Sequence, residues 1–200
     1  MTSYALPKKK TWPVSMASFE THLELLQRIS AGDEFALREL YEAYGRRLYA
    51  YALRLTGEPA LAEDVVQETL ITVWRAGGKY RGDGRVLAWL LSIVHNLALK
   101  TLRRQSILMT DEVEASLPAP DDSPEIQTQR SEQTRWLQQG LQSLSPEHRA
   151  VLELVFYQGL SLEETAQVCN CPLGTVKSRL SYARQHLRGT LIRQNMEEWR

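Results

Sequence analysis

The 200-residue chain is poor in cysteine and has no long apolar run. Its two cysteines, Cys169 and Cys171, are one residue apart, which is too close for an ordinary structural disulfide. Even with His186 added, they supply fewer than the four ligands of a structural zinc site. Nowhere do 18 apolar residues occur together, and the basic N-terminal segment lacks the apolar core of a signal peptide. These absences predict a cytoplasmic protein with no metal site and no membrane insertion.

The motifs of common enzyme classes are also missing. The sequence has no glycine-rich phosphate loop, no nucleophile elbow and no pair of catalytic carboxylates, and its four histidines are scattered singly. Its acidic residues cluster on predicted helix faces and in one acidic strip. We therefore predict that the chain is not an enzyme and uses no cofactor or small-molecule substrate.

The net charge is zero, but the charges are unevenly distributed. Residues 1–110 hold 15 basic and 11 acidic residues, residues 111–134 hold 1 and 7, and residues 135–200 hold 8 and 6. In the last block, five cations follow one another with no acidic residue among them: Lys177, Arg179, Arg184, Arg188 and Arg193. Such a dense local cluster is typical of a nucleic-acid surface.

The pattern predicts an all-α chain of two small helical domains joined by an acidic flexible linker. Apolar residues recur at helical spacing on both sides of a segment rich in Pro, Asp and Ser, and no alternating run is bounded by hairpin turns. We expect a disordered extension (1–19), a first domain (20–107), the linker (108–125), a second domain with four helices (126–194) and a tail (195–200).

Capping residues place the helices of the first domain. Asp33 can cap a helix that Gly57 ends, after a shorter helix over about 22–30. Pro59 suits the first turn of a third helix over about 60–75, and a fourth is expected over about 86–104.

The second domain contains the layout of a helix-turn-helix unit. Ser145 and Pro146 open one helix, which Gly159 closes, and the capping box from Ser161 to Glu164 opens a short one to about Val168. A tight turn then leads into a longer basic helix over about 174–192. In a helix-turn-helix, the second helix enters the major groove of DNA.

This last helix has two different faces. At 100° per residue, one stripe is apolar and should pack on the short helix: Val176, Leu180, Ala183, Leu187 and Leu191. The other face is polar: Lys177, Ser181, Arg184 and Arg188 in line, with Ser178, Tyr182 and Gln185 beside them. Cations and hydroxyls suit phosphates and base edges, so the face fits a DNA groove; the alternative is a solvated helix surface.

Two motif clusters carry a resemblance to a known family. The run ETAQVCNCPLGTVKSRLSYARQHLR resembles the promoter-binding helix-turn-helix of bacterial extracytoplasmic-function (ECF) RNA polymerase sigma factors. LAEDVVQETLITVWR, at 61–75, is similar to the family's helix that docks on the clamp of the polymerase largest subunit. YRGDGRVLAWLLSIVHNLALKTLRR, at 80–104, resembles its strand-opening segment. The resemblance covers about residues 20–193.

The resemblance implies roles for residues of the first domain. Asp64, Gln67 and Glu68 match core-polymerase contacts, and the alternative for them is a solvated face. Residues matched to the minus-ten element are Tyr80, Arg81, Trp89, Asn96, Lys100, Arg103 and Arg104. Trp89 and Asn96 would hold and read an extruded base, while a core tryptophan is the alternative for Trp89. An amide buried in so apolar a stretch would need a partner, which favours a functional Asn96.

In the second domain, the resemblance implies minus-thirty-five contacts from Thr175, Lys177, Ser178, Arg179, Ser181, Tyr182, Arg184 and Arg188. The sequence departs from the family pattern at Ser92, where many members carry arginine, and near Val86 and Leu87, where many carry a second aromatic residue. These departures leave the promoter preference and the strength of melting open.

The implied function is a sigma factor that binds core RNA polymerase and promoter DNA, promotes strand opening and is held by an anti-sigma factor, with the free chain a monomer. One rival is a helix-turn-helix regulator that never binds core polymerase, although it needs a dimer and no dimer helix is evident. Another is an all-α adaptor, which leaves the Asp64, Gln67 and Glu68 cluster and the run from Gly174 to Arg179 unexplained together.

Overall fold

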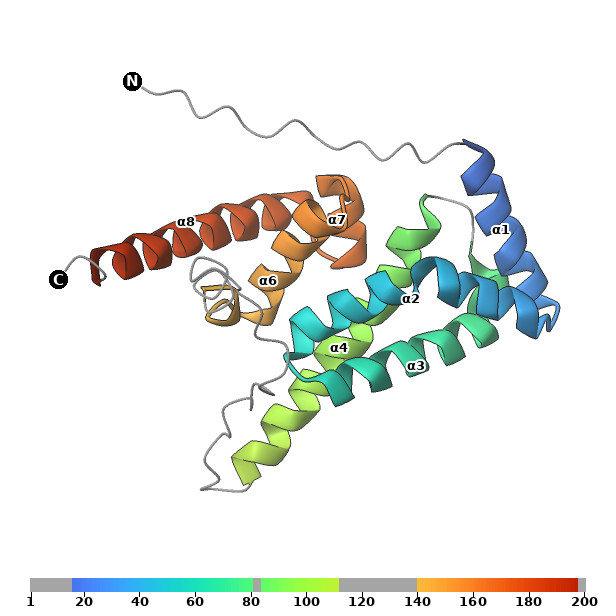
Figure 1. The fold of residues 1–200 in the computed structure, drawn as a ribbon, viewed down its shortest axis with the longest axis horizontal. Helices are drawn as coiled ribbons and strands as arrows, with labels where there is room; N and C mark the ends of the chain where they lie inside the picture. Colours follow the sequence, from blue (N-terminus) through green and yellow to red (C-terminus); the bar gives the residue numbers. More distant parts are fainter. Residues whose placement is uncertain (1–15, 81–83, 112–139, 198–200) are drawn as a thin grey trace, which may run out of the picture.

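The computed structural model describes residues 16–80, 84–111 and 140–197, and its regular elements there are all helical, which confirms the all-α prediction. The N-terminal helices are α1 (Met16–Ser30), α2 (Glu34–Thr56), α3 (Pro59–Ala76), the short η1 (Gly77–Lys79) and α4 (Val86–Asp111). The C-terminal helices are α6 (Pro146–Leu152), η3 (Glu153–Tyr157), α7 (Leu162–Val168) and α8 (Leu173–Glu197). Figure 1 shows both groups.

The predicted caps of α2 are confirmed. The Asp33 carboxylate accepts from the amides of Phe35 and Ala36, and the helix ends at Gly57 with a left-handed φ of 77°. The Gly57 amide donates to the Leu53 carbonyl, which satisfies one of the free carbonyl groups at the helix end. Both ends of α2 are therefore fixed by the residue types at 33 and 57.

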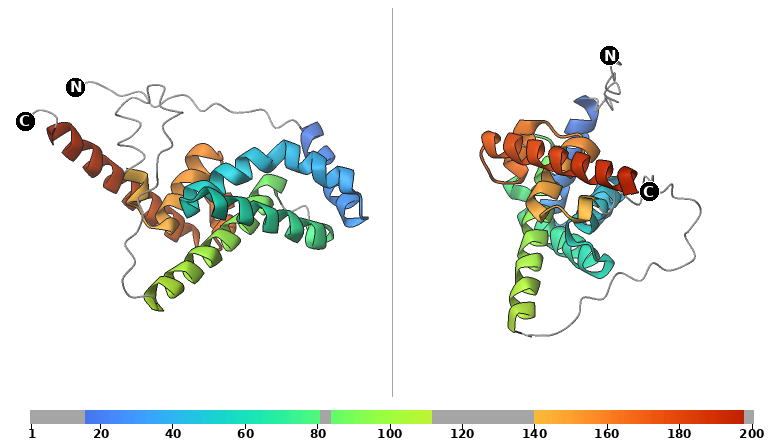
Figure 2. Two further views of the ribbon diagram at one scale, coloured as in Figure 1. Left: turned by 60° about the horizontal axis from the view of Figure 1, so that its bottom comes forward. Right: turned by 90° about the vertical axis from the view of Figure 1, so that its left-hand side faces the viewer.

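Helix α4 is the central element of the N-terminal bundle. It begins at Val86 as predicted but continues to Asp111, beyond the expected end near Arg104. Its first half packs against α2 and α3 through Leu90, Leu91 and Val94, none of them exposed, and its second half projects from the bundle (Figures 1 and 2). Within the described residues, Val86–Ser106 is the one stretch long and apolar enough to cross a membrane, but 44% of its selected 18-residue window is buried in the bundle. We conclude that α4 is a core helix.

The C-terminal helices form the expected helix-turn-helix. Ser161 caps α7 and makes a reciprocal capping box with Glu164, while Ser145 precedes Pro146 but does not cap α6 with its side chain. Helix α6 widens into the π-helical turn η3 before Gly159 closes it. The helix predicted before residue 140 lies mostly outside the described residues.

The two groups of helices share one apolar core. Ala150, Leu154, Leu160 and Val168 from the C-terminal helices belong to the same buried cluster as α2 and α4. Helix α7 packs on α4, and α6 packs on α2 (Figure 2). A second cluster, which includes Val151 and Val176, lies within the C-terminal helices. The chain therefore adopts a docked arrangement, which its sequence did not predict.

Candidate nucleic-acid interface

Helix α8 separates its two faces as predicted. Val176, Leu180 and Ala183 are at most 6% exposed and pack on α6 and α7, and Leu187 is half-buried. The exposed side chains are Lys177, Ser178, Ser181, Tyr182, Arg184, Gln185 and Arg188. The polar face is thus free to meet a partner along its length.

Two residues matched to the minus-thirty-five contacts are less accessible than the others. Thr175 is half-buried, and its carbonyl accepts from Ser178 Oγ at 3.0 Å. Arg179 is also half-buried, with Nη1 3.9 Å from Cys171 Sγ. Burial lowers the pKa of His95 on α4, and the charge of Arg179 adds to this shift.

Helix α3 presents one continuous exposed face. Asp64, Gln67 and Glu68 are exposed, whereas Val65 and Val66 between them are buried. One turn further on, Ile71 is 42% exposed and Trp74 is 37% exposed. Helical spacing in the sequence places Ile71 on this face. The same spacing also places Trp74 there, since it is three residues after Ile71, although the sequence analysis did not single it out. Acid, amide and apolar groups therefore adjoin on one face.

Trp89 lies at the start of α4 between core and surface. It is half-buried, packs against the core cluster and lies 5.4 Å, between ring centroids, from Tyr80. The Tyr80 hydroxyl donates to the Gly84 carbonyl, closing the loop whose Arg81 falls outside the described residues. Ser92 Oγ donates to the Trp89 carbonyl at 2.7 Å, so the serine at this position bonds its own helix.

Asn96 is not buried, contrary to the prediction from its apolar surroundings in the sequence. Asn96 is exposed because α4 turns this position away from α2 and α3, so its amide needs no protein partner. Lys100, Arg103 and Arg104 are also exposed, on the projecting half of α4, and form no hydrogen bond or ion pair within the described chain. An amide and three cations thus extend along an accessible part of α4.

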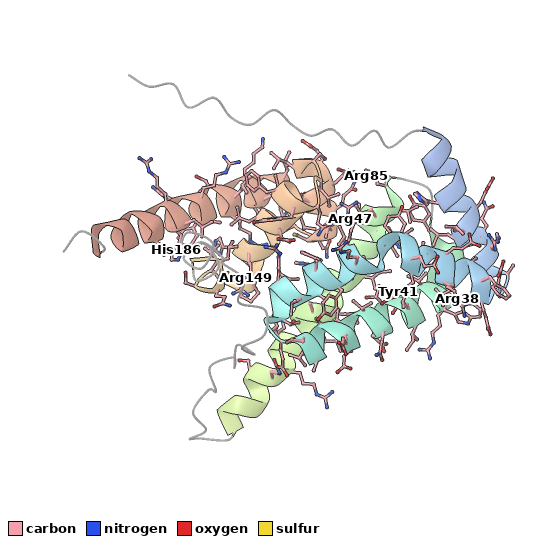
Figure 3. The ribbon with its side chains drawn as sticks, viewed as in Figure 1. Arg38, Tyr41, Arg47, Arg85, Arg149 and His186 are labelled. Carbon is pink, nitrogen blue, oxygen red and sulfur yellow. The ribbon has the colours of Figure 1, made fainter. Side chains whose placement is uncertain are left out.

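Two arginines, one on α2 and one just before α4, hold the turn before α7. Arg47 donates from Nε to Gln158 Oε1 at 3.1 Å and from Nη2 to the Gln158 carbonyl at 2.8 Å. Arg85 donates to the Gly159 carbonyl at 3.3 Å and pairs with Glu164 at 3.6 Å. Figure 3 labels both arginines near the boundary between the N-terminal and C-terminal helices.

An ion pair between an exposed arginine and a buried glutamate joins α2 to η3. Arg54 Nε lies 3.2 Å from Glu153 Oε2, and its guanidinium lies 4.1 Å from the centroid of the Tyr157 ring. The Glu153 side chain is 4% exposed, and burial raises its pKa to about 7 even though Arg54 and Gln158 favour the charged form. Arg149 adds a further bond, from Nη1 to the Arg54 carbonyl at 3.0 Å.

His95 forms the other ionisable part of this boundary. Its Nδ1 is 2.9 Å from the Tyr51 hydroxyl, and both side chains are buried. Burial, with a smaller contribution from Arg179, lowers the pKa of His95 to about 4, and Glu147 opposes that shift. Burial likewise raises the pKa of Tyr51. The docked arrangement therefore holds His95 neutral.

The cysteine positions do not form a ligand cluster. Burial raises the pKa of Cys169 to about 12, so the thiol is protonated. His186 bonds Ser143 instead of approaching the cysteines. Among residues that the structure describes, no three His, Cys, Asp or Glu side chains are grouped as metal ligands.

The sequence matches two families of known proteins. Residues 40–107 match the family described as Sigma-70 region 2, and residues 140–189 match Sigma-70, region 4. The chain is 35% identical to the ECF RNA polymerase sigma factor SigL of Mycobacterium tuberculosis, over 81% of this chain and 92% of that protein. It is 32% identical to the RNA polymerase sigma-H factor of Pseudomonas aeruginosa, over 85% of this chain and 93% of that protein.

Solved structures show the same architecture. The sigma factor RpoE from Bartonella quintana, crystallised with the anti-sigma factor NepR, has 29% identity and a TM-score of 0.61, covering 77% of this chain and 95% of that one. CnrH, in complex with the cytosolic domain of CnrY, shares the fold with a TM-score of 0.60 at 23% identity, covering 85% of this chain and 96% of that one.

Proposed function

Because the chain belongs to the ECF RNA polymerase sigma factors, we propose that its exposed faces on α3, α4 and α8 divide polymerase binding, minus-ten recognition and minus-thirty-five recognition among them. The observation that carries this assignment is the exposure of all three faces on helices whose opposite sides form the core. The protein acts in the cytoplasm by placing the polymerase, and it catalyses no reaction itself.

The α3 face binds the clamp of the polymerase largest subunit. Asp64, Gln67 and Glu68 offer carboxylate and amide groups that suit an arginine-bearing helix. Ile71 and Trp74 supply apolar area beside them. This combination of an apolar anchor and a polar rim is typical of protein interfaces.

The α4 face captures the opened minus-ten strand. Tyr80 and Trp89 form an aromatic pair on which an extruded base can stack, and Asn96 offers both a donor and an acceptor. Arg81, Lys100, Arg103 and Arg104 neutralise phosphates. Stacking and amide bonding together offset the few kcal/mol that unstacking costs.

The α8 face reads duplex DNA at the minus-thirty-five element. Lys177, Ser178, Ser181 and Tyr182 reach base edges, and Arg184 and Arg188 contact phosphates. Thr175 and Arg179, which are half-buried, add contacts to the same element from the start of α8.

Separation of the domains is a required step of this function. The two promoter elements lie about 25 base pairs apart, or about 85 Å along B-DNA at 3.4 Å per pair. In the docked arrangement, the helices that read them share one apolar core. An anti-sigma factor that holds the domains together would therefore silence both, and the free chain would remain a monomer.

Run-off transcription with purified core polymerase on a promoter library tests the proposal. Asp64→Ala should weaken binding to core by about ten- to a hundredfold, since a charge-assisted bond contributes about 1.5–3 kcal/mol. Glu24→Ala, which removes an exposed acid on α1, is the matched control and should bind core normally. If the unaltered chain neither co-elutes with core nor directs initiation, the proposed function is wrong.

A further inference from the structure

Tyr182 on α8 is held between two imidazole rings. The ring of His148, on α6, lies 4.5 Å from the Tyr182 ring between centroids, at 43°. The ring of His186, one turn further along α8, lies 6.1 Å away and nearly parallel, at 19°. Tyr182 itself is 53% exposed. An exposed aromatic ring is thus fixed on both sides while its outer part stays accessible.

Each histidine is in turn bonded to a serine just before α6. Ser145 Oγ lies 2.7 Å from His148 Nδ1, and Ser143 Oγ lies 2.8 Å from His186 Nε2. The Ser143 hydroxyl donates its one proton to the Gly140 carbonyl at 2.9 Å, so its oxygen accepts from His186 Nε2. His186 therefore carries its proton on Nε2 and is oriented by the segment it faces (Figure 3).

The close approach of that segment to α8 depends on a glycine. A Cβ atom at Gly140 would lie 3.0 Å from Leu187 Cδ2, which is closer than ordinary van der Waals contact. The bonded serines and histidines are therefore held against the helix by close packing. Together, His148, His186, Ser143 and Ser145 form a bracket around Tyr182, and we use this name for them below.

Tyr182 occupies one edge of the polar face of α8. At 100° per residue, Lys177, Arg184 and Arg188 lie along the other edge, with Gln185 between the two edges. If the cationic edge follows phosphates, the bracketed ring faces base edges in the same groove. An aromatic ring in the major groove contacts the 5-methyl group of thymine, the one apolar group displayed there.

We propose that His148 and His186 are positioning residues that hold Tyr182 to recognise a thymine methyl group at one base pair of the minus-thirty-five element. This inference rests on the proposed function of α8. A ring already ordered in the free protein loses less conformational freedom on binding, and ordering one side chain costs about 0.5–1.5 kcal/mol, equivalent to about two- to tenfold in affinity. The bracket thus contributes to base discrimination without touching DNA.

The test uses holoenzyme, assembled from the full chain and core polymerase, on promoters selected from a randomised minus-thirty-five library. Each thymine of the preferred element is replaced in turn by deoxyuridine, which removes only the methyl group. We expect one position at which this change weakens promoter binding by about fourfold, as for one buried carbon. Tyr182→Ala should abolish that sensitivity and leave the other positions unaltered.

The histidine variants separate positioning from folding. His148→Ala and Ser143→Ala should each reduce the deoxyuridine effect at the same position, and His148→Phe, which keeps a ring, should restore it. In a Tyr182→Ala background, His148→Ala should have no further effect on promoter binding. Arg188→Ala is the contrasting variant and should weaken binding equally at all positions.

A methyl effect that persists in Tyr182→Ala, or a His148→Ala loss spread evenly over all positions, overturns the inference. Initiation with no methyl-sensitive position also overturns it but leaves the sigma function intact. Failure of the unaltered holoenzyme to initiate from any library member contradicts the proposed function instead, so the two failures are distinguishable.

Discussion

Removing the titratable group of Glu153 or of His95 should reveal two opposite pH dependences of domain docking. Glu153 has a pKa of about 7 when docked against an ordinary value of 4.5, and His95 has about 4 against 6.5. Glu153 therefore stabilises docking at low pH and loses that contribution as pH rises towards 7. For His95 the sign is reversed. Because its pKa is lowered on docking, His95 stabilises docking above pH 6.5, and this stabilisation is lost as the pH falls towards 4.

The two contributions nearly cancel in the unaltered chain. Each amounts to about 1.4 kcal/mol per pH unit between about pH 5 and pH 6.5, provided that separation returns both side chains to water. In the Glu153→Gln variant, docking should become stronger by about 2 kcal/mol as the pH rises over that interval, because the His95 contribution is no longer offset. His95→Asn, whose amide can still bond Tyr51, should weaken docking by about the same amount.

Single-molecule energy transfer between dyes at Phe35 and Arg188, both exposed, measures the fraction of docked chains. The charged and polar groups that act on the two side chains are Arg54 and Gln158 for Glu153, and Arg179 and Glu147 for His95. Parallel pH profiles for the two variants, or a flat profile for both, would refute the reasoning, since it requires slopes of opposite sign.

Three further outcomes follow from local geometry. Gly57→Ala should lower the free energy of unfolding by about 1–2 kcal/mol, measured by thermal denaturation, because a Cβ is strained at φ 77°; an unaltered melting temperature would contradict this. Asp33→Ala should cost about 1 kcal/mol in the same assay through loss of the α2 cap, and Asp33→Asn should recover most of it. Arg104→Ala should reduce the salt dependence of promoter binding by about one counterion for every sequence tested, and a sequence-selective loss would argue against a phosphate contact.

Local patterns predicted the helices and their faces well. Asp33, Gly57 and the Ser161 capping box each act over a few residues, so their effect is readable from sequence. The same holds for the stripe through Val176 and Leu180, because helical spacing alone determines it.

The contacts between the two groups of helices escaped prediction for a physical reason. Arg47 and Gln158 are 111 residues apart, and no periodicity links them. From the sequence, Glu153 would be expected at the surface. It is buried beside Arg54, which lies on a different helix, so local sequence could not predict the contact. For Asn96 the error was the opposite one. Its apolar neighbours predicted burial, but this position of α4 is exposed.

Helix α4 also fixes the distance between two parts of the proposed DNA-binding face. Trp89 is packed in the bundle, and Arg104 lies 15 residues later on the same unbroken helix, about 22 Å away at 1.5 Å per residue. In the proposed function, the number of residues in α4 therefore sets the interval between the captured base and the phosphates gripped beyond it, and an inserted residue would also turn the cations by 100°.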